Sequence, residues 1–330
     1  MVDEGPGFGV SEHLYFEDFP VGASREFCRY DLTRDQVEAY AADFDPLLGA
    51  RKGKAGALAA SPWQLPALLM RLNYDGWMNE AAARGAPGVD EARWLRPLIA
   101  GEIVSARYTV RSARVSRSKP HLGLVQFFYE LLGDDRTPVF SQLNSVMIEL
   151  RAPQQAEADV RADGAVRNSD PSAGLGEGAT IALGTIDFPA DQVIAFGHIY
   201  DPQPFHIDAA AAQAGPFGAL AASGWHTAAG WARAYATSVE AGTPGLPSPG
   251  RLLWLKPLRW RKPVFAGDRI AFEFAPGGVA KSADSDGAMT AIGRGRGRDG
   301  SGAAVFEFTL GMMVSDNRGA AAGVGASRAL

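Results

Sequence analysis

The sequence contains an internal repeat, which restricts the architectures that the chain can adopt. The segment GKAGALAASPWQ at 53–64 matches GPFGALAASGWH at 215–226, and RDQVEAYAADFDP at 34–46 matches ADQVIAFGHIYDP at 190–202. The first pair is offset by 162 residues and the second by 156, so the first copy lacks six residues between the two blocks. We therefore expect two related domains in one chain.

The repeat also suggests where the domains end. A later block, VFSQLNSVMI at 139–148, has its counterpart in VFEFTLGMMV at 305–314. Residues 152–179 between the copies are rich in alanine, glycine, proline and polar residues without an apolar period, which is typical of a linker. The expected organisation is a first domain over 1–151, a linker over 152–179, a second domain over 180–315 and a flexible tail over 316–330.

Within each copy the apolar pattern predicts helices followed by strands. A short helix is expected at Val37–Tyr40 in the first copy and at Val193–Phe196 in the second. A longer helix is expected at Leu65–Asn73 in the first copy and at Thr227–Tyr235 in the second. Alternating runs then predict strands at 103–110, 125–132 and 140–150 in the first copy and at 270–274, 290–298 and 304–314 in the second. One long helix packed on an antiparallel sheet is an α+β architecture.

The composition argues against several classes of function. A formal net charge of −5 argues against a general nucleic-acid or anionic-membrane surface. No apolar run approaches the roughly 20 residues of a membrane span, and the N-terminus lacks a basic region followed by an apolar core, so we expect a cytoplasmic protein. Cys28 is the only cysteine and the five histidines are scattered, so we expect neither a disulfide nor a metal site.

The run YDPQPFHID at 200–208 holds the strongest chemical signal. It places the carboxylate of Asp201 five positions before the imidazole of His206, with Pro202 and Pro204 in between. Because proline fixes φ and lacks an N–H, we expect a rigid, irregular loop. A histidine oriented by a carboxylate can bind a water and move its protons, which favours acid-base chemistry on a small molecule. A solvated loop with an incidental histidine remains the alternative.

Five segments together resemble the MaoC-like dehydratases, the (R)-specific enoyl-CoA hydratase group. They are YFEDFPVG at 15–22, FDP at 44–46, YDPQPFHID at 200–208, PFGALAASGWHT at 216–227 and PVFAGD at 263–268. The resemblance implies a hotdog fold, in which a curved antiparallel sheet wraps a central helix. Since the resemblance occurs twice, it implies a double hotdog that mimics a dimer of single-domain members.

The resemblance also implies the site residues. Asp201 and His206 match the catalytic aspartate and histidine of the family, whereas Gln203 stands where the family often has asparagine. The backbone N–H of Gly224 matches the group that polarises the thioester carbonyl, and a helix N-terminus suits that role because its first N–H groups are free. The expected substrate-binding residues are Gln203, Ser223, Gly224 and Trp225.

The first copy departs from this pattern at two places. Asp45 and Pro46 are retained, but the missing six residues leave no counterpart of His206. Pro62 stands where the second copy has Gly224, and proline offers no backbone N–H to a thioester oxygen. We therefore expect a degenerate first domain and one active site per chain.

The implied reaction is the reversible hydration of a trans-2-enoyl-CoA to an (R)-3-hydroxyacyl-CoA, with either Asp201 or His206 taking the proton of water. The acyl-CoA is then the substrate, and no separate cofactor is expected. A homodimer of such chains is compatible with the sequence. Two other functions remain open for a hotdog protein, namely an acyl-CoA thioesterase and a non-catalytic acyl-CoA-binding protein.

Two further features leave alternatives open. His226 beside Trp225 has either a structural or a substrate-lining role. The run GRGRGRDG at 293–300 has the composition of some RNA-binding segments, but it aligns with a predicted strand of the first copy, so we expect a strand that ends in a turn. If Gly293, Gly295 and Gly297 face inward on that strand, their small size leaves extra room for an acyl chain.

Overall fold

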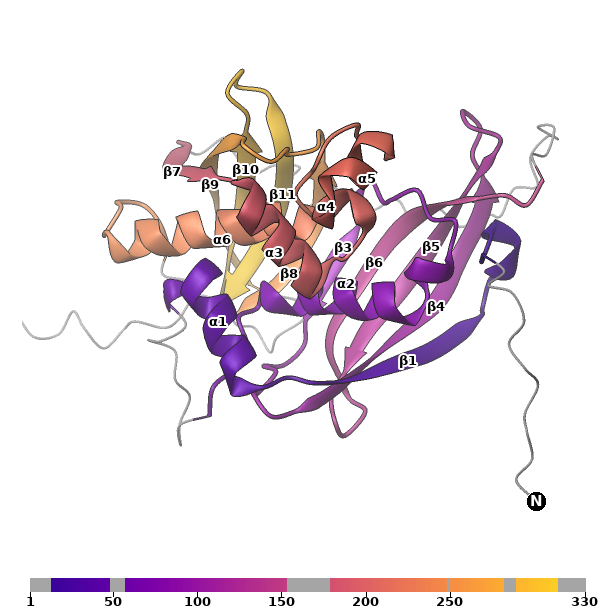
Figure 1. Cartoon of the computed structure of the whole chain (residues 1–330). Coiled ribbons are helices and arrows are strands. Elements are labelled where there is room, and N and C mark those ends of the chain that lie inside the picture. The colour runs from indigo at the N-terminus through magenta and orange to yellow at the C-terminus, as the bar shows by residue number, and fades with distance from the viewer. Residues whose placement is uncertain (1–12, 48–56, 153–178, 248–249, 282–288, 314–330) are drawn as a thin grey trace, which may run out of the picture.

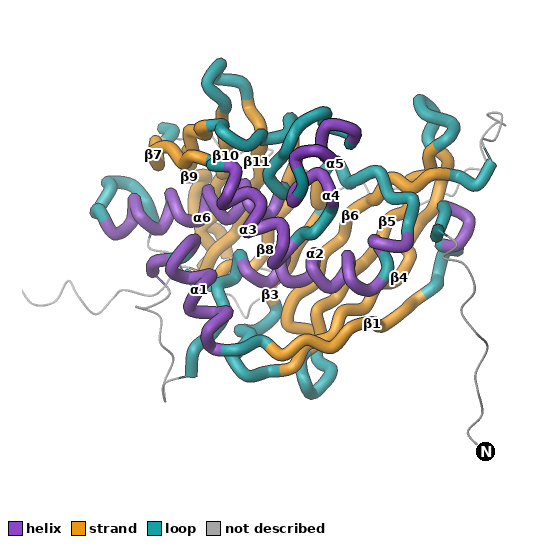
Figure 2. The backbone as a smooth tube through the Cα atoms, viewed as in Figure 1, coloured by secondary structure: helices purple, strands orange, loops and turns teal. Residues whose placement is uncertain are grey.

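The computed structural model describes residues 13–47, 57–152, 179–247, 250–281 and 289–313. Their strands form one eleven-stranded sheet in the order β1-β4-β5-β6-β3-β8-β11-β10-β9-β7, with β2 paired to β8. Every named pair of strands is antiparallel. Figure 1 shows the helices gathered on one side of this curved sheet, and Figure 2 shows the same layering by element type.

The first half of the chain forms one end of the sheet. Its elements are η1 (Phe16–Asp18), β1 (Ser24–Asp31), α1 (Arg34–Phe44), α2 (Gln64–Gly76), η4 (Met78–Glu80), β2 (Gly88–Val89), β3 (Glu91–Trp94), β4 (Ile103–Val115), β5 (Leu122–Leu132) and β6 (Pro138–Glu149). Helix α2 crosses the strands of this half (Figure 1), and it is buried along most of its length.

The second half repeats the pattern with two additional short helices. Its elements are β7 (Ile181–Asp187), α3 (Ala190–Tyr200), α4 (Pro204–Ile207), α5 (Ala209–Ala214), α6 (Gly224–Glu240), β8 (Leu252–Trp260), β9 (Arg269–Lys281), β10 (Met289–Arg298) and β11 (Ala304–Met313). Helix α6 takes the place of α2 as the central helix of this half.

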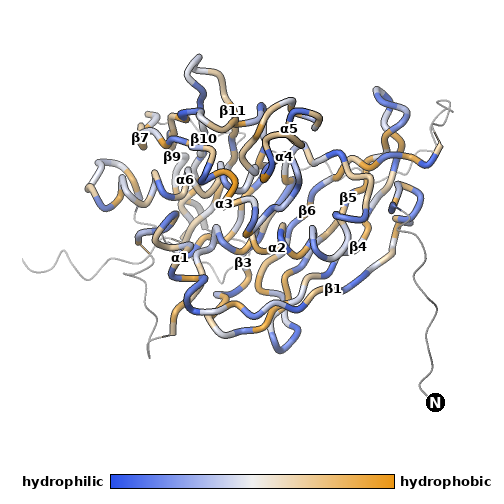
Figure 3. The backbone as a smooth tube through the Cα atoms, in the orientation of Figure 1, coloured by the Kyte–Doolittle hydropathy of each residue, from blue (hydrophilic) through white to orange (hydrophobic). Residues whose placement is uncertain are grey.

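Local sequence explains these elements. Thr33 begins α1 with a capping box, in which its hydroxyl accepts the N–H of Gln36 and the Gln36 side chain accepts the N–H of Thr33. Strand β5 alternates between buried and partly exposed residues, so one of its faces packs into the core, where Phe127 and Tyr129 lie. Hydrophobic and hydrophilic residues alternate along the strands, and the loops from β4 to β5 and from β5 to β6 are hydrophilic (Figure 3).

The two halves join through the sheet and through their helices. Strand β3 pairs with β8, and Ala92 lies opposite Leu255. On the helical side, Arg71 of α2 donates to the carbonyl of His198 at the end of α3 at 2.7 Å. Arg233 of α6 donates in the same way to Asp43 at the end of α1, also at 2.7 Å. Each central helix therefore contacts a helix of the other half.

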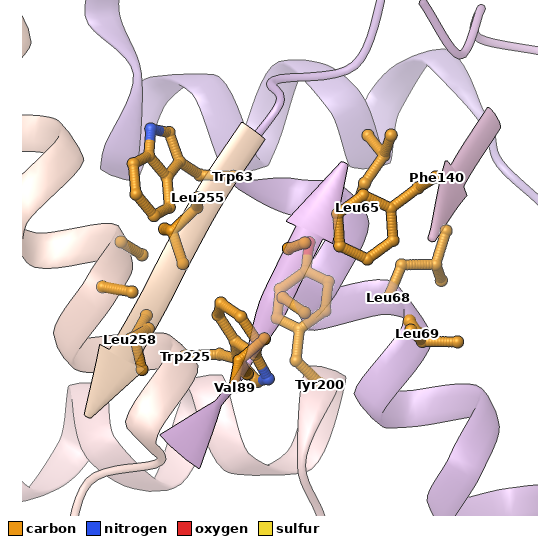
Figure 4. Packing of buried hydrophobic residues seen from close by; sticks show 14 of the residues in the cluster. Trp63, Leu65, Leu68, Leu69, Val89, Phe140, Tyr200, Trp225, Leu255 and Leu258 are labelled. Atoms are coloured by element: carbon orange, nitrogen blue, oxygen red, sulfur yellow. The ribbon is translucent and has the colours of Figure 1, made fainter. Parts of the chain in front are cut away.

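Apolar side chains from both halves fill the space between them. Figure 4 shows Trp63 of the first half beside Leu255 of the second, and Val89 of the first half close to Trp225 and Leu258 of the second. All five are buried within one continuous core. The two halves therefore pack against each other through a common core.

The α+β double hotdog expected from the sequence is confirmed, and several details need correction. The central helices and strands β4, β5 and β9 are longer than expected, and strands β1, β2, β3, β7 and β8 were not predicted. The domain boundaries at 151 and 180 stay a prediction, because most of the expected linker and the expected tail lie outside the described residues.

Two local predictions are wrong. The run at 200–208 is not irregular throughout, because Pro204 begins α4 at a first helical position, where its missing N–H costs no hydrogen bond. Gly293, Gly295 and Gly297 do face inward on β10, but they leave no extra room. A methyl group at these three positions would overlap the rings of Phe274, Phe308 and Phe272, respectively.

Candidate active site

A cavity of about 360 Å³ lies between the two halves. The second half contributes Asp201, His206 and Gly224 to its wall, and the first half contributes residues from α2, η4 and β6. This volume is within the range of about 300–1,000 Å³ that is usual for small-molecule sites. All six of the predicted site residues line this cavity: Asp201, Gln203, His206, Ser223, Gly224 and Trp225.

Asp201 and His206 face each other at one point of the wall. Their side chains come from the end of α3 and from α4, and His206 Nε2 lies 3.4 Å from Asp201 Oδ2. Asp201 is 4 % exposed and His206 is 5 % exposed. The N···O distance is longer than an ordinary hydrogen bond of about 2.7–3.2 Å, so the two groups are adjacent without being tightly bonded to each other.

A backbone carbonyl sets the tautomer of the histidine. His206 Nδ1 lies 2.7 Å from the carbonyl oxygen of Ala221. Since a carbonyl only accepts, Nδ1 carries the proton and donates it to Ala221. In the neutral imidazole, Nε2 is then the acceptor nitrogen, and it is this atom that faces Asp201.

Two neighbouring side chains orient the carboxylate. The Ser223 hydroxyl donates to Asp201 Oδ2 at 2.6 Å, and the Gln203 amide donates to Asp201 Oδ1 at 2.9 Å. Ser223 also caps α6, because its oxygen accepts the N–H of Trp225. Both oxygens of the Asp201 carboxylate therefore accept a hydrogen bond. The side chain of Gln203, which is longer than the asparagine expected from the resemblance, reaches the carboxylate as a donor.

Gly224 begins α6 directly after this serine. As the first residue of the helix, it has an N–H without an intrahelical acceptor. Its carbonyl accepts the indole N–H of Trp260 at 3.1 Å. The Trp260 ring lies so close that a methyl group at position 224 would overlap it. Trp260 was not predicted as a site residue, although it lies at the offset of 166 from Trp94, which bonds the carbonyl of Pro62 in the same way.

The first half retains a remnant of this arrangement. Ser61 donates to Asp45 at 2.8 Å, as Ser223 does to Asp201. The cavity beside Asp45 is only about 30 Å³, since Trp63 and residues of α6 and β11 fill it. The indole of Trp63 packs against Trp231 with ring centroids 5.6 Å apart. This space is too small for an acyl thioester, which agrees with the expectation that the first copy is degenerate.

His226 has a structural position. It is 3 % exposed and stacks on Phe196 with ring centroids 4.6 Å apart, and the rings of Phe44 and Phe188 cover its edges. It is not among the residues that line the cavity. Burial, with a smaller effect from the nearby His206, lowers the pKa of His226 to about 3.

We expect this buried histidine to make the protein sensitive to acid. As the pH falls from about 6.5 toward 3, the unfolded chain binds a proton at His226 that the folded chain does not, so the free energy of unfolding decreases. The loss between pH 7 and pH 4.5 is about 2–3 kcal/mol. Urea unfolding of the parent and of His226→Gln at both pH values measures it, and the variant should lose correspondingly less.

The exposed His198 on α3 provides a matched control. His198→Gln should keep the pH dependence of the parent. Equal pH dependence in the parent and in His226→Gln would contradict the assignment of a neutral, buried histidine.

The first half also contributes polar residues that the sequence analysis missed. Asn73 on α2 and Gln142 and Asn144 on β6 line the cavity, and each is at most 7 % exposed. The repeat could have indicated these residues, because they are polar where the second copy has the large side chains Tyr235, Phe308 and Leu310. 

Neither a metal-binding group of side chains nor a membrane-spanning helix is found among the residues that the structure describes. In this part of the chain, no three histidine, cysteine, aspartate or glutamate side chains are grouped so that they could hold a metal ion. None of the helices described here combines the length and the apolar character that crossing a bilayer requires.

Residues 177–292 match a protein-family model described as the MaoC like domain. The match covers α3 to α6, the segment that holds Asp201, His206 and Gly224. The resemblance inferred from the motifs is therefore confirmed for the second half of the chain. No curated protein shows significant similarity to the chain.

Solved structures with a similar fold cover most of the chain. A protein from Chloroflexus aurantiacus, described as a MaoC domain protein dehydratase, has a TM-score of 0.75 at 15% identity, covering 94% of this chain and 100% of its own. A protein from Mycobacterium tuberculosis with a double hotdog fold has a TM-score of 0.67 at 16% identity, covering 92% and 99%.

A third similar structure belongs to a larger enzyme. The peroxisomal multifunctional enzyme type 2 of Drosophila melanogaster has a TM-score of 0.55 at 15% identity, covering 87% of this chain and 48% of its own. At these identities the likeness concerns the fold.

Proposed function

We propose that the MaoC-like domain in the second half of this chain catalyses the reversible hydration of a trans-2-enoyl-CoA to an (R)-3-hydroxyacyl-CoA. Asp201 and His206 carry out the proton transfers of this reaction, and the first half of the chain forms the opposite wall of the cavity. Water and the thioester supply every atom of the product, so the reaction needs no cofactor.

One observation carries this proposal, namely that two hydrogen-bond acceptors face the same point. When the imidazole is neutral, Nδ1 donates to Ala221 and Nε2 has an acceptor lone pair, and the Asp201 carboxylate is an acceptor 3.4 Å away. A water molecule has two O–H donors and satisfies both groups at once. Its oxygen is then oriented with its remaining lone pairs toward the cavity, as an attacking nucleophile requires.

The same wall of the cavity can stabilise the negative charge that develops during the reaction. When water adds to C3 of the enoyl group, one of the two acceptors takes its proton, and a proton is delivered to C2. Negative charge develops on the thioester oxygen in this step. The free N–H of Gly224 at the start of α6 is a suitable donor to that oxygen, an interaction worth about 2.7–4 kcal/mol.

The cavity also suits a substrate with an anionic carrier. Arg84, Arg261 and Lys262 line it, and their side chains are 50–55% exposed. They therefore lie where the cavity meets solvent, whereas Asp201 and His206 are buried. Exposed cations at the entrance support binding of the phosphate groups of CoA outside the reaction chamber.

The test follows the enoyl absorbance and the free thiol in one reaction mixture. With crotonyl-CoA and longer trans-2-enoyl-CoAs, we expect the enoyl absorbance to fall without release of thiol, and chiral analysis to give the (R)-3-hydroxy product. Release of CoA thiol would instead establish a thioesterase. Thermal stabilisation by acyl-CoA without any turnover would establish a binding protein. Each of these two results contradicts the proposal.

A further inference from the structure

The part of the cavity wall that the first half contributes contains three amide side chains. Asn73 comes from α2, and Gln142 and Asn144 come from the inward face of β6. Their exposed fractions are 4 %, 7 % and 6 %. A hydrogen-bonding cluster at such buried positions needs a reason, because the inner face of a hotdog sheet is normally filled by apolar packing.

The repeat shows that the fold does not require these amides. The corresponding residues of the second half are Tyr235, Phe308 and Leu310. Tyr235 and Leu310 line the small cavity beside Asp45, and Phe308 packs against Trp63 with ring centroids 5.6 Å apart. The same positions are therefore large and mostly apolar where the site is closed, and polar where the site is open.

The hydrogen bonds of the amides leave one acceptor without a partner. Gln142 Nε2 donates to Asn144 Oδ1 at 2.9 Å, and Asn73 Oδ1 accepts the indole N–H of Trp77 at 3.3 Å. Gln142 Oε1 is buried and accepts no hydrogen bond from any residue that the structure describes. An unsatisfied buried acceptor is costly, so this atom calls for a donor on the ligand.

We propose that the acyl chain of the substrate carries a hydroxyl group, which donates to Gln142 Oε1 and accepts from the amide N–H groups of Asn73 or Asn144. This inference rests on the proposed hydratase function and specifies its substrate class. A plain alkyl chain would leave the buried acceptor unpaired, and sites built to bond a substrate hydroxyl discriminate strongly against analogues that lack it.

The charges near the amides favour a neutral group over a carboxylate. The cations that line the cavity, Arg84, Arg261 and Lys262, are solvent-exposed and form ion pairs with Glu149, Glu307 and Asp299, respectively. A carboxylate would also place an acceptor against the unpaired acceptor of Gln142. A hydroxyl carries no charge and has both a donor and acceptors.

The test compares trans-2-enoyl-CoAs of equal length that end in a methyl group, a hydroxymethyl group or a carboxylate. The parent should prefer the hydroxylated substrate at its best chain length by at least about tenfold in kcat/KM, or about 1.4 kcal/mol. In the double variant Gln142→Met/Asn144→Leu this preference should fall by about the same factor. Ser145→Ala, on the partly exposed face of β6, is the matched control and should keep it.

A second measurement separates this inference from the proposed function. The saturated acyl-CoAs with and without the terminal hydroxyl are titrated by calorimetry, and the parent should bind the hydroxylated one more tightly. If the double variant does not fold, Gln142→Met alone serves in both experiments.

Two results would overturn the inference while leaving the hydratase function intact. They are hydration of the plain and hydroxylated substrates at equal kcat/KM, and a preference for the carboxylate. Failure to hydrate any of these compounds would overturn the proposed function, and equal affinity for the two saturated acyl-CoAs would overturn the inference.

Discussion

Replacing His206 with glutamine is expected to lower kcat for enoyl-CoA hydration by about 10²–10⁴-fold, while the protein stays folded. Glutamine has a similar reach, but its amide nitrogen is not a base and cannot take a proton from water. His206 lines the cavity, and the amide N–H of glutamine can replace its hydrogen bond to the Ala221 carbonyl, so we expect the fold to be retained. Initial rates with the best enoyl-CoA, together with thermal unfolding, measure both parts of this prediction.

His198→Gln is the matched control for this experiment. His198 lies on the neighbouring helix α3 and is exposed, and Arg71 donates to its backbone carbonyl rather than to its imidazole. Its replacement should leave kcat within about twofold, because exposed side chains outside the site contribute little. A folded His206→Gln protein that hydrates its substrate at the rate of the parent would show that the imidazole takes no part in the reaction.

A pair of substitutions at Gly224 isolates the contribution of its backbone N–H. The Cβ atom of either alanine or proline at this position would overlap the ring of Trp260, so the two variants share this clash. Only proline removes the N–H, and proline is well tolerated at a first helical position. We expect Gly224→Pro to have a kcat lower than that of Gly224→Ala by about 10²–10³-fold, the usual effect of losing one oxyanion donor.

The first half supplies the natural precedent for this change. Pro62 stands at the position equivalent to Gly224, in the half whose site is filled. Thermal unfolding of both variants controls for stability. Equal kcat in folded Gly224→Ala and Gly224→Pro proteins would mean that a different donor polarises the thioester oxygen.

The site was predictable to the extent that its chemistry is local in sequence. Asp201, Gln203 and His206 lie within six residues, and the prolines between them restrict the chain, so their proximity follows from the motif. Ser223 and Gly224 follow from the repeated block, since a helix start is readable from sequence. The structure brings all of them to one cavity wall.

The remaining half of the cavity was not predictable, because it depends on contacts between distant segments. Asn73 and Gln142 reach Asp201's cavity only through the packing of the first half onto the second. The pattern of alternation shows that Gln142 shares a strand face with Phe140, but it does not show which cavity that face meets. The glycines of β10 could not be interpreted from sequence for the same reason, because aromatic rings from other strands occupy the space above them.

Two of the strands that were not predicted, β2 and β3, are too short to be recognised from sequence. Strand β3 has four residues and β2 has two, too few for a recognisable alternation. They are strands because they complete the junction between the halves, where β3 pairs with both β6 and β8. Their conformation is thus decided by neighbours rather than by their own sequence.

The claim that only the second half is catalytic is tested most directly by replacing one carboxylate with an amide in each half. Asp201→Asn and Asp45→Asn alter equivalent carboxylates, each bonded by a serine, at Ser223 and Ser61. Measured as kcat with the same enoyl-CoA, Asp201→Asn should lose at least about 10²-fold, and Asp45→Asn should stay within about twofold of the parent. Loss of activity in folded Asp45→Asn, or full activity in folded Asp201→Asn, would contradict a single site in the second half.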